Sequence, residues 1–150
     1  MVFVPYRGED YLDWPATLAW CEAAVAAAPQ WLALETLGHS REGRVIPVLV
    51  VGARGEAAER GAAFWLDAGT HCAEWTGVMA ALYAVSRWVE GLLAGDPALT
   101  AWFSAHRAFV LPCVSPDGYV AMHRGEPFLR STLRPPRDGR PRVGLDPSDL

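Results

Sequence analysis

The sequence lacks the features that mark several classes of protein. No apolar run approaches the roughly 18 residues needed to cross a membrane, so a membrane-spanning protein is not expected. The formal charge is −4, which argues against a general affinity for nucleic acid or for an anionic membrane surface. The first residues have no basic start followed by a long apolar core, so no secretory signal is expected.

Cysteine is also scarce. The three cysteines, Cys21, Cys72 and Cys113, cannot all pair with one another, and their spacing fits no zinc-knuckle pattern. A disulfide framework is therefore not expected. Together with the absence of a secretory signal, this predicts a reduced, cytoplasmic protein.

What the chain does contain is enough apolar sequence for one globular domain. It has 150 residues, 51% of them hydrophobic, a length typical of a single domain. Apolar spacing and turn signals predict the following elements: helices at 16–28, 76–94 and 97–104, and strands at 31–37, 44–52, 62–68 and 107–112. The tryptophans in these elements, among them Trp65 and Trp102, are expected in the core.

The order of these elements predicts the fold class. The first two strands are joined by a short turn, which is typical of an antiparallel hairpin. The strand at 62–68, the long helix and the strand at 107–112 form a βαβ unit. Residues 54–61 are expected to form a loop, and 115–118 a turn. The prediction is an α/β fold with a mixed β-sheet flanked by helices, in one domain over 1–150 whose last part, about 124–150, is irregular and rich in arginine and proline.

His71 and Glu74 form the most informative pair in the sequence. They follow the predicted strand at 62–68 and come just before the long helix. Open α/β sheets place their sites where strands end and helices begin. Imidazole nitrogen and carboxylate oxygen are both ordinary zinc ligands, and a catalytic zinc usually keeps three protein ligands and a water. The pair could supply two of these three; alternatively it is a solvated His-x-x-Glu at a helix start, where glutamate favours the helix dipole.

Four segments in the same order carry a resemblance to a known family. They are Gly-His-Ser-Arg-Glu-Gly-Arg at 38–44, His-Cys-Ala-Glu-Trp at 71–75, Leu-Pro-Cys-Val-Ser-Pro-Asp-Gly-Tyr at 111–119 and Phe-Leu-Arg-Ser-Thr-Leu-Arg at 128–134. In this arrangement the chain resembles the N-terminal half of the catalytic domain of the zinc metallocarboxypeptidases related to carboxypeptidase A. Two positions depart from the family pattern: Ser115 stands where asparagine is usual, and Leu129 where tryptophan is usual.

The resemblance implies roles for three residues. His71 and Glu74 match two zinc ligands, and Arg130 matches the arginine that polarises the scissile carbonyl and stabilises the oxyanion. Arg134 is the alternative, because the residue before Arg130 departs from the pattern. The implied cofactor is one Zn²⁺ per complete site, and the implied substrate is a peptide or a small amide. Leu150 comes before the family's third zinc ligand, its general base and its specificity pocket, so zinc is expected to be weak or absent in this chain alone.

Two functional hypotheses stay open at this point. The first is a zinc-dependent metallocarboxypeptidase, completed by a missing C-terminal half or by another chain. The second is an inactive fragment, a pseudoenzyme or an interaction module. Other metal donors are weaker candidates: His39, His106 and His123 are expected in a turn or loops, and Cys72 is expected to be a small buried residue. The six arginines after residue 123 could suggest an RNA-binding arm, but the acidic domain favours a loop that packs on further protein.

Overall fold

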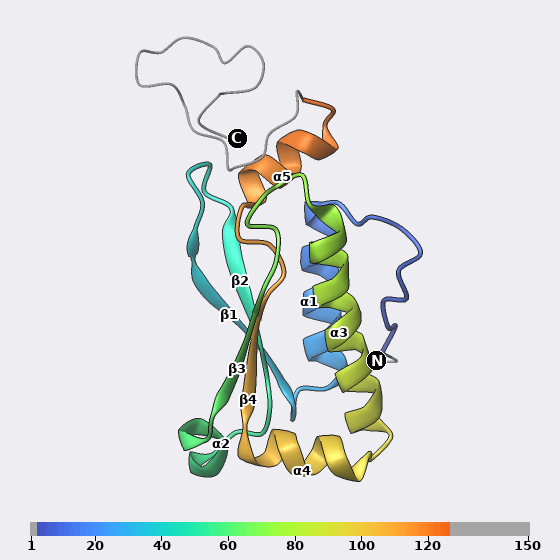
Figure 1. Cartoon of the computed structure of the whole chain (residues 1–150), viewed down its shortest axis with the longest axis vertical. Coiled ribbons are helices and arrows are strands. Elements are labelled where there is room, and N and C mark those ends of the chain that lie inside the picture. Colours follow the sequence, from blue (N-terminus) through green and yellow to red (C-terminus); the bar gives the residue numbers. More distant parts are fainter. Residues whose placement is uncertain (1–2, 127–150) are drawn as a thin grey trace.

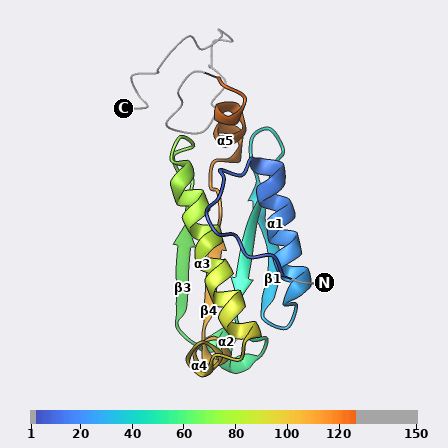
Figure 2. The same cartoon turned by 90° about the vertical axis from the view of Figure 1, so that its right-hand side faces the viewer.

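The computed structural model describes residues 3–126 (Figure 1). The elements in chain order are α1 (Trp14–Ala27), β1 (Leu32–His39), β2 (Val45–Val51), α2 (Glu56–Arg60), β3 (Ala63–Asp67), α3 (Trp75–Leu93), α4 (Pro97–Ala105), β4 (Arg107–Leu111) and α5 (Pro116–His123). The four strands form one sheet in the order β1-β2-β4-β3. Helices α1 and α3 cover one face of this sheet (Figure 2). The predicted α/β fold with a mixed sheet is confirmed.

Helix α1 begins where the sequence signals indicate. The Asp13 carboxylate accepts a hydrogen bond from the backbone N–H of Ala16 at 2.9 Å, which satisfies one of the free donors of the first turn. Pro15 lies in that turn, where a missing N–H costs nothing. The buried residues of α1 are Trp14, Thr17, Cys21 and Ala24.

Strands β1 and β2 form the expected antiparallel hairpin. Pro47 lies within β2, and a proline inside a strand indicates either an edge position or an irregularity. The edge alternative is wrong, because β2 lies between β1 and β4. Pro47 instead pairs with Thr36, next to a register shift between Thr36 and Gly38. A proline cannot donate to the ladder, so an irregular position in the sheet tolerates it.

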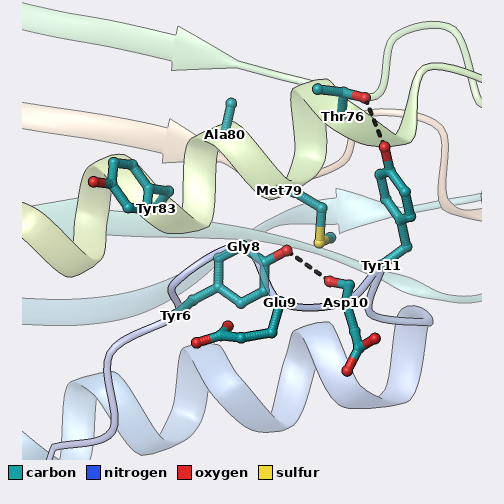
Figure 3. A pocket seen from close by; sticks show the side chains of 9 residues that line it. All are labelled: Tyr6, Gly8, Glu9, Asp10, Tyr11, Thr76, Met79, Ala80 and Tyr83. Atoms are coloured by element: carbon teal, nitrogen blue, oxygen red, sulfur yellow. Dashed lines mark hydrogen bonds between the residues drawn. The ribbon is translucent and has the colours of Figure 1, made fainter.

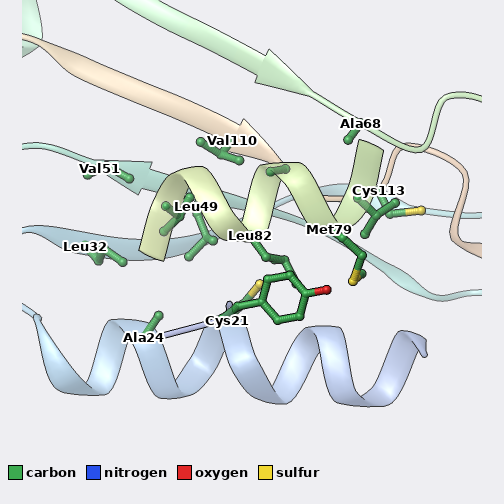
Figure 4. Close-up of a cluster of buried hydrophobic side chains, with 14 of the residues drawn as sticks. Cys21, Ala24, Leu32, Leu49, Val51, Ala68, Met79, Leu82, Val110 and Cys113 are labelled. Carbon is green, nitrogen blue, oxygen red and sulfur yellow. The ribbon is translucent and has the colours of Figure 1, made fainter. Parts of the chain in front are cut away.

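The β3–α3–β4 unit is the framework of the molecule. Strands β3 and β4 pair in parallel, and α3 connects them with one apolar face on the sheet. The core lies between this sheet face and the two helices (Figure 4). Its fully buried members include Leu49, Leu82, Val85 and Val110.

Two segments expected to be irregular are short helices. Residues 54–61, expected to be a loop, contain α2, which has a buried alanine, Ala58. The turn expected at 115–118 is the start of α5, with Pro116 in its first turn. His123 is therefore helical and does not lie in a loop. The segment 127–150 is outside the described residues, so the prediction of an irregular tail stays a prediction.

The expectation that all the element tryptophans are core residues is wrong for two of them. Trp65 on β3 and Trp102 on α4 are about half exposed. Apolar character predicts burial only where another element covers the side chain, and β3 is an edge strand of the described sheet. Among the helices of residues 3–126, none combines the length and hydropathy required to span a bilayer.

Candidate metal centre

The candidate site lies at the end of the sheet where β3 and β4 finish. The loop after β3 is joined to the loop after β4 by backbone hydrogen bonds, from Val114 N–H to Ala68 O at 2.9 Å and from Ser115 N–H to Gly69 O at 3.0 Å. The Ser115 hydroxyl donates a further bond to Thr70 O at 2.9 Å. The serine at this departure from the family pattern thus holds the loop that leads to His71.

Gly69 is required for the close contact between these loops. Its φ is +60°, a left-handed conformation that favours glycine. A Cβ atom at this position would lie 2.8 Å from Cys113 Sγ and 3.0 Å from Val78 Cγ2. The turn from β3 toward His71 and Glu74 therefore leaves little room for a side chain at residue 69.

His71 and Glu74 converge at the end of this loop. The Nδ1 atom of His71 lies 2.9 Å from Oε1 of Glu74, and the side chains are 33% and 60% exposed. Glu74 N–H donates to His71 O at 3.1 Å, which forms a tight turn before α3. Two ligands bound at about 2.0–2.2 Å in tetrahedral geometry are about 3.4 Å apart. A small separation of the two side chains would let both atoms contact one ion.

The helix that follows contributes to the charge of this site. Glu74 occupies the N-cap position of α3, and its carboxylate makes no capping bond. The N-terminus of a helix carries a partial positive charge that stabilises a nearby carboxylate. The side chain therefore faces His71 and is not used to cap the helix.

The residues described here provide two candidate ligands, His71 and Glu74. Within residues 3–126, no three histidine, cysteine, aspartate or glutamate side chains are grouped closely enough to hold a metal ion. His106 lies at the opposite end of β4, with Nδ1 3.1 Å from Ala62 O. Cys72 is fully buried, as the sequence predicts. The described residues thus offer two donors that suit Zn²⁺. A usual three-ligand site needs a third donor from outside the described residues.

His123 packs beside the site but is not grouped with it as a ligand. Its ring stacks on the Trp75 indole, with centroids 4.1 Å apart and an angle of 17° between planes. Burial lowers the pKa of His123 below its usual 6.5, although Asp13 acts in the opposite direction. The stack joins α5 to the first residue of α3, directly after Glu74. Trp75 therefore packs against α5 directly after Glu74.

A buried carboxylate connects the motif at 38–44 with the motif at 111–119. Asp117 is 1% exposed and accepts hydrogen bonds from Ser40 Oγ at 2.6 Å, from Glu42 N–H at 3.1 Å and from Arg44 Nη1 at 2.6 Å. Burial would raise the pKa of Asp117, but these bonds and the charge of Arg44 hold it below 3.8. The sequence motifs contain all four residues, but only the fold shows that they meet.

The predicted catalytic residue cannot be placed. Arg130 and its alternative Arg134 lie outside residues 3–126, so their roles stay predictions.

Comparison with known proteins decides the family. The sequence profile described as zinc carboxypeptidase matches residues 17–148. The chain belongs to the zinc carboxypeptidase family. Carboxypeptidase A2 of Rattus norvegicus is 35% identical over 124 residues, which is 83% of this chain and 28% of that protein. The crystal structure of thrombin activatable fibrinolysis inhibitor superimposes with a TM-score of 0.76 at 23% identity, covering 91% of this chain and 33% of that structure.

A third relative is named as inactive. The inactive metallocarboxypeptidase ecm14 of Talaromyces marneffei is 26% identical over 115 residues, covering 75% of this chain and 19% of that protein. This zinc carboxypeptidase chain therefore spans about a third or less of the length of each of these relatives. The family resemblance drawn from the four motifs is confirmed, and the matched part corresponds to a portion of each relative.

Proposed function

We propose that this chain supplies one half of a metallocarboxypeptidase site, with His71 Nδ1 and Glu74 Oε1 as two ligands of one Zn²⁺. The observation that carries the proposal is the 2.9 Å approach of these two atoms at the end of β3. Their side chains are partly exposed and face each other. Further polypeptide, in the same or another chain, completes the site.

The chemistry assigned to the complete site is hydrolysis of a C-terminal peptide bond, or of a small amide. Bound zinc supplies a Lewis acid that polarises a carbonyl and lowers the pKa of water. In this chain His71 and Glu74 would hold the ion, and the bonds from Ser115 to Gly69 and Thr70 anchor the loop that leads to them. Arg130 is assigned to the oxyanion, where a positioned cation stabilises developing charge.

Zinc titration calorimetry of the purified 150-residue chain tests the metal assignment. We expect weak binding of one Zn²⁺ by the unaltered chain. His71→Ala and Glu74→Gln should each weaken it at least about 10–100-fold, because even the loss of a group that only supports a ligand has such an effect. His106→Ala is the matched control and should leave the affinity unchanged. Equal binding by His71→Ala and the unaltered chain would refute the assignment.

The second candidate function is that of an interaction module, in a chain that is an inactive member of the family. It is supported by the lack of a third grouped ligand within residues 3–126 and by the relative named as inactive. Hydrolysis assays separate the two functions. They use one peptide with a free C-terminal carboxylate and one whose C-terminus is blocked. We expect no hydrolysis by the chain alone. Activity that appears with added polypeptide and is lost in His71→Ala favours the enzyme; zinc-independent association without activity favours the module.

A further inference from the structure

Residues 6–12 form a segment that runs along α3 and leaves a cavity beside it. The Tyr6 N–H donates to Ser86 Oγ at 2.8 Å, and the Leu12 N–H donates to Met79 Sδ at 3.4 Å. Between these two attachments an open cavity of about 330 Å³ separates the segment from the first turns of α3 (Figure 3). The lining of this N-terminal cavity does not include the candidate zinc ligands, so the two sites are separate.

Two of the tyrosines that line the N-terminal cavity are held by hydrogen bonds. Tyr6 is 7% exposed, and its hydroxyl donates to the backbone O of Asp10 at 2.6 Å. The hydroxyls of Tyr11 and Thr76 lie 3.2 Å apart, and the Tyr11 ring packs edge-on against Trp75 with centroids 5.8 Å apart (Figure 3). Because these contacts form without a ligand, ordering the walls adds little to the cost of binding.

The segment also brings two neighbouring carboxylates to the N-terminal cavity, Glu9 and Asp10, both exposed. Asp10 holds Tyr6 through its backbone carbonyl, which leaves its carboxylate available to a ligand. Burial raises the pKa of the Tyr6 phenol, and the negative charges of Glu9 and Asp10 raise it further, as expected if both carboxylates lie near the ring. The adjacent cation does not neutralise them, because the Arg7 guanidinium pairs with Glu90 at 2.5 Å. The cavity therefore favours a positive charge.

The other walls of the N-terminal cavity are aromatic or apolar. Tyr11 is 56% exposed and Tyr83 44%, and Met79 and Ala80 contribute apolar surface from α3. The face of a tyrosine ring attracts a cation. A metal ion is not favoured, because within residues 3–126 no three histidine, cysteine, aspartate or glutamate side chains are grouped closely enough to hold one. An ammonium group on an apolar body matches both kinds of wall.

We propose that the N-terminal cavity binds a small organic ammonium ion. Its charged group lies beside the carboxylates of Glu9 and Asp10, and its apolar body lies against Met79 and the rings of Tyr11 and Tyr83. The ammonium donates hydrogen bonds to the carboxylates, and such charge-assisted bonds are stronger than neutral ones. Binding needs neither zinc nor further polypeptide, so it does not depend on the proposed function.

Titration calorimetry of the full 150-residue chain, at low ionic strength and without added metal, tests the site. The probe is 2-phenylethylammonium, and we expect saturable 1:1 binding. The alcohol 2-phenylethanol has the same apolar body without the charge and should bind at least about tenfold more weakly. The double variant Glu9→Gln with Asp10→Asn should lose at least about tenfold in affinity for the ammonium ion. Glu22→Gln, which removes an exposed carboxylate from α1, is the matched control and should bind normally.

A second pair of variants tests the aromatic wall. Tyr11→Ala removes the ring and should weaken binding about threefold or more, whereas Tyr11→Phe keeps the ring and should bind as the unaltered chain does. Circular dichroism shows whether the variants keep the fold, which is expected because the substituted side chains are exposed. Equal loss in Tyr11→Ala and Tyr11→Phe would contradict a role for the ring face.

The remaining results separate this site from the metal centre. NMR chemical shifts should change in residues 6–11 and at the start of α3 when the probe is added. No saturable binding, equal affinity for the alcohol and the ammonium ion, shifts confined to another part of the chain, or full binding by the double variant would overturn the site. His71→Ala should bind the probe normally, and the double carboxylate variant should keep the zinc affinity of the unaltered chain. Failure of the metal assignment and failure of the ammonium site are therefore distinguishable.

Discussion

The Arg44 guanidinium lies 2.6 Å from the Asp117 carboxylate, and this pair joins the β1–β2 turn to the start of α5. Asp117 is fully buried, whereas Arg44 keeps partial contact with water. Ser40 supports both partners, because its hydroxyl donates to Asp117 and accepts from the Arg44 backbone N–H at 3.0 Å. The β1–β2 turn and the start of α5 are therefore held together by one buried charge with several donors.

Replacement of Asp117 by alanine should destabilise the fold strongly. It leaves the Arg44 side chain and the Ser40 hydroxyl without their shared acceptor. Removing one partner of a buried pair costs about 3–5 kcal/mol, and the partial exposure of Arg44 lowers the expected loss to about 2–4 kcal/mol. Urea unfolding measures it. Arg60→Ala, which breaks the exposed Arg60–Glu56 pair, should change stability by less than about 1 kcal/mol; similar losses in both variants would contradict a special role for Asp117.

The same carboxylate should make stability depend on pH in the acid range. Its pKa in the folded state is below 3.8, so the unfolded chain binds the proton first as pH falls. The stability that ionised Asp117 contributes is fully present above the unfolded pKa and is lost as pH falls through the folded pKa. The difference in unfolding free energy between the unaltered chain and Asp117→Asn should be constant above about pH 5 and shrink below pH 4. A constant difference down to pH 3 would contradict this.

The sequence predicted the elements whose apolar spacing is long and regular. Helix α3 repeats apolar residues every three or four positions, and β3 and β4 are short apolar runs on either side of it, so the parallel unit followed directly. The spacing of His71 and Glu74 placed both at one strand end, and the structure brings them together. These predictions depend on local pattern, which the sequence contains in full.

The missed features depend on contacts between distant segments. Helix α5 includes Gly118 and has little apolar periodicity; its first turn is held instead by the bonds of Asp117 to the β1–β2 turn. Trp65 was expected in the core because apolar residues usually are, but its burial depends on a neighbouring strand that residues 3–126 do not supply.

Gly69 should be far less tolerant of alanine than a glycine with a similar backbone in open space. Gly69 and Gly95 both have positive φ, 60° and 75°, but a Cβ at Gly95 meets nothing within 4 Å. Gly95→Ala should therefore cost about 1–2 kcal/mol, from conformation alone. Gly69→Ala should cost about 1–3 kcal/mol more, because its Cβ would press on Cys113 and Val78. Urea unfolding of both variants measures the two losses of stability. Equal losses would show that Cys113 and Val78 move aside at little cost in free energy.

His123 should make the stability of the fold depend on pH in a second range. Here the cause is burial of a neutral ring, whereas for Asp117 it is the bonding of a charged group. Burial lowers its pKa in the folded state below 6.5, so the neutral ring is the form that stacks on Trp75. As pH falls through 6.5 the unfolded chain is protonated first, and stability declines until the pH passes the folded pKa. His123→Phe keeps a ring on Trp75 but has no proton to bind, so the difference in unfolding free energy between His123→Phe and the unaltered chain should grow as pH falls from 7.5 to 5. His106→Phe is the matched control, since its ring packs on Trp102 at the other end of the sheet, and it should retain the decline attributed to His123. If His123→Phe loses stability with falling pH as steeply as the unaltered chain, the titrating group lies elsewhere.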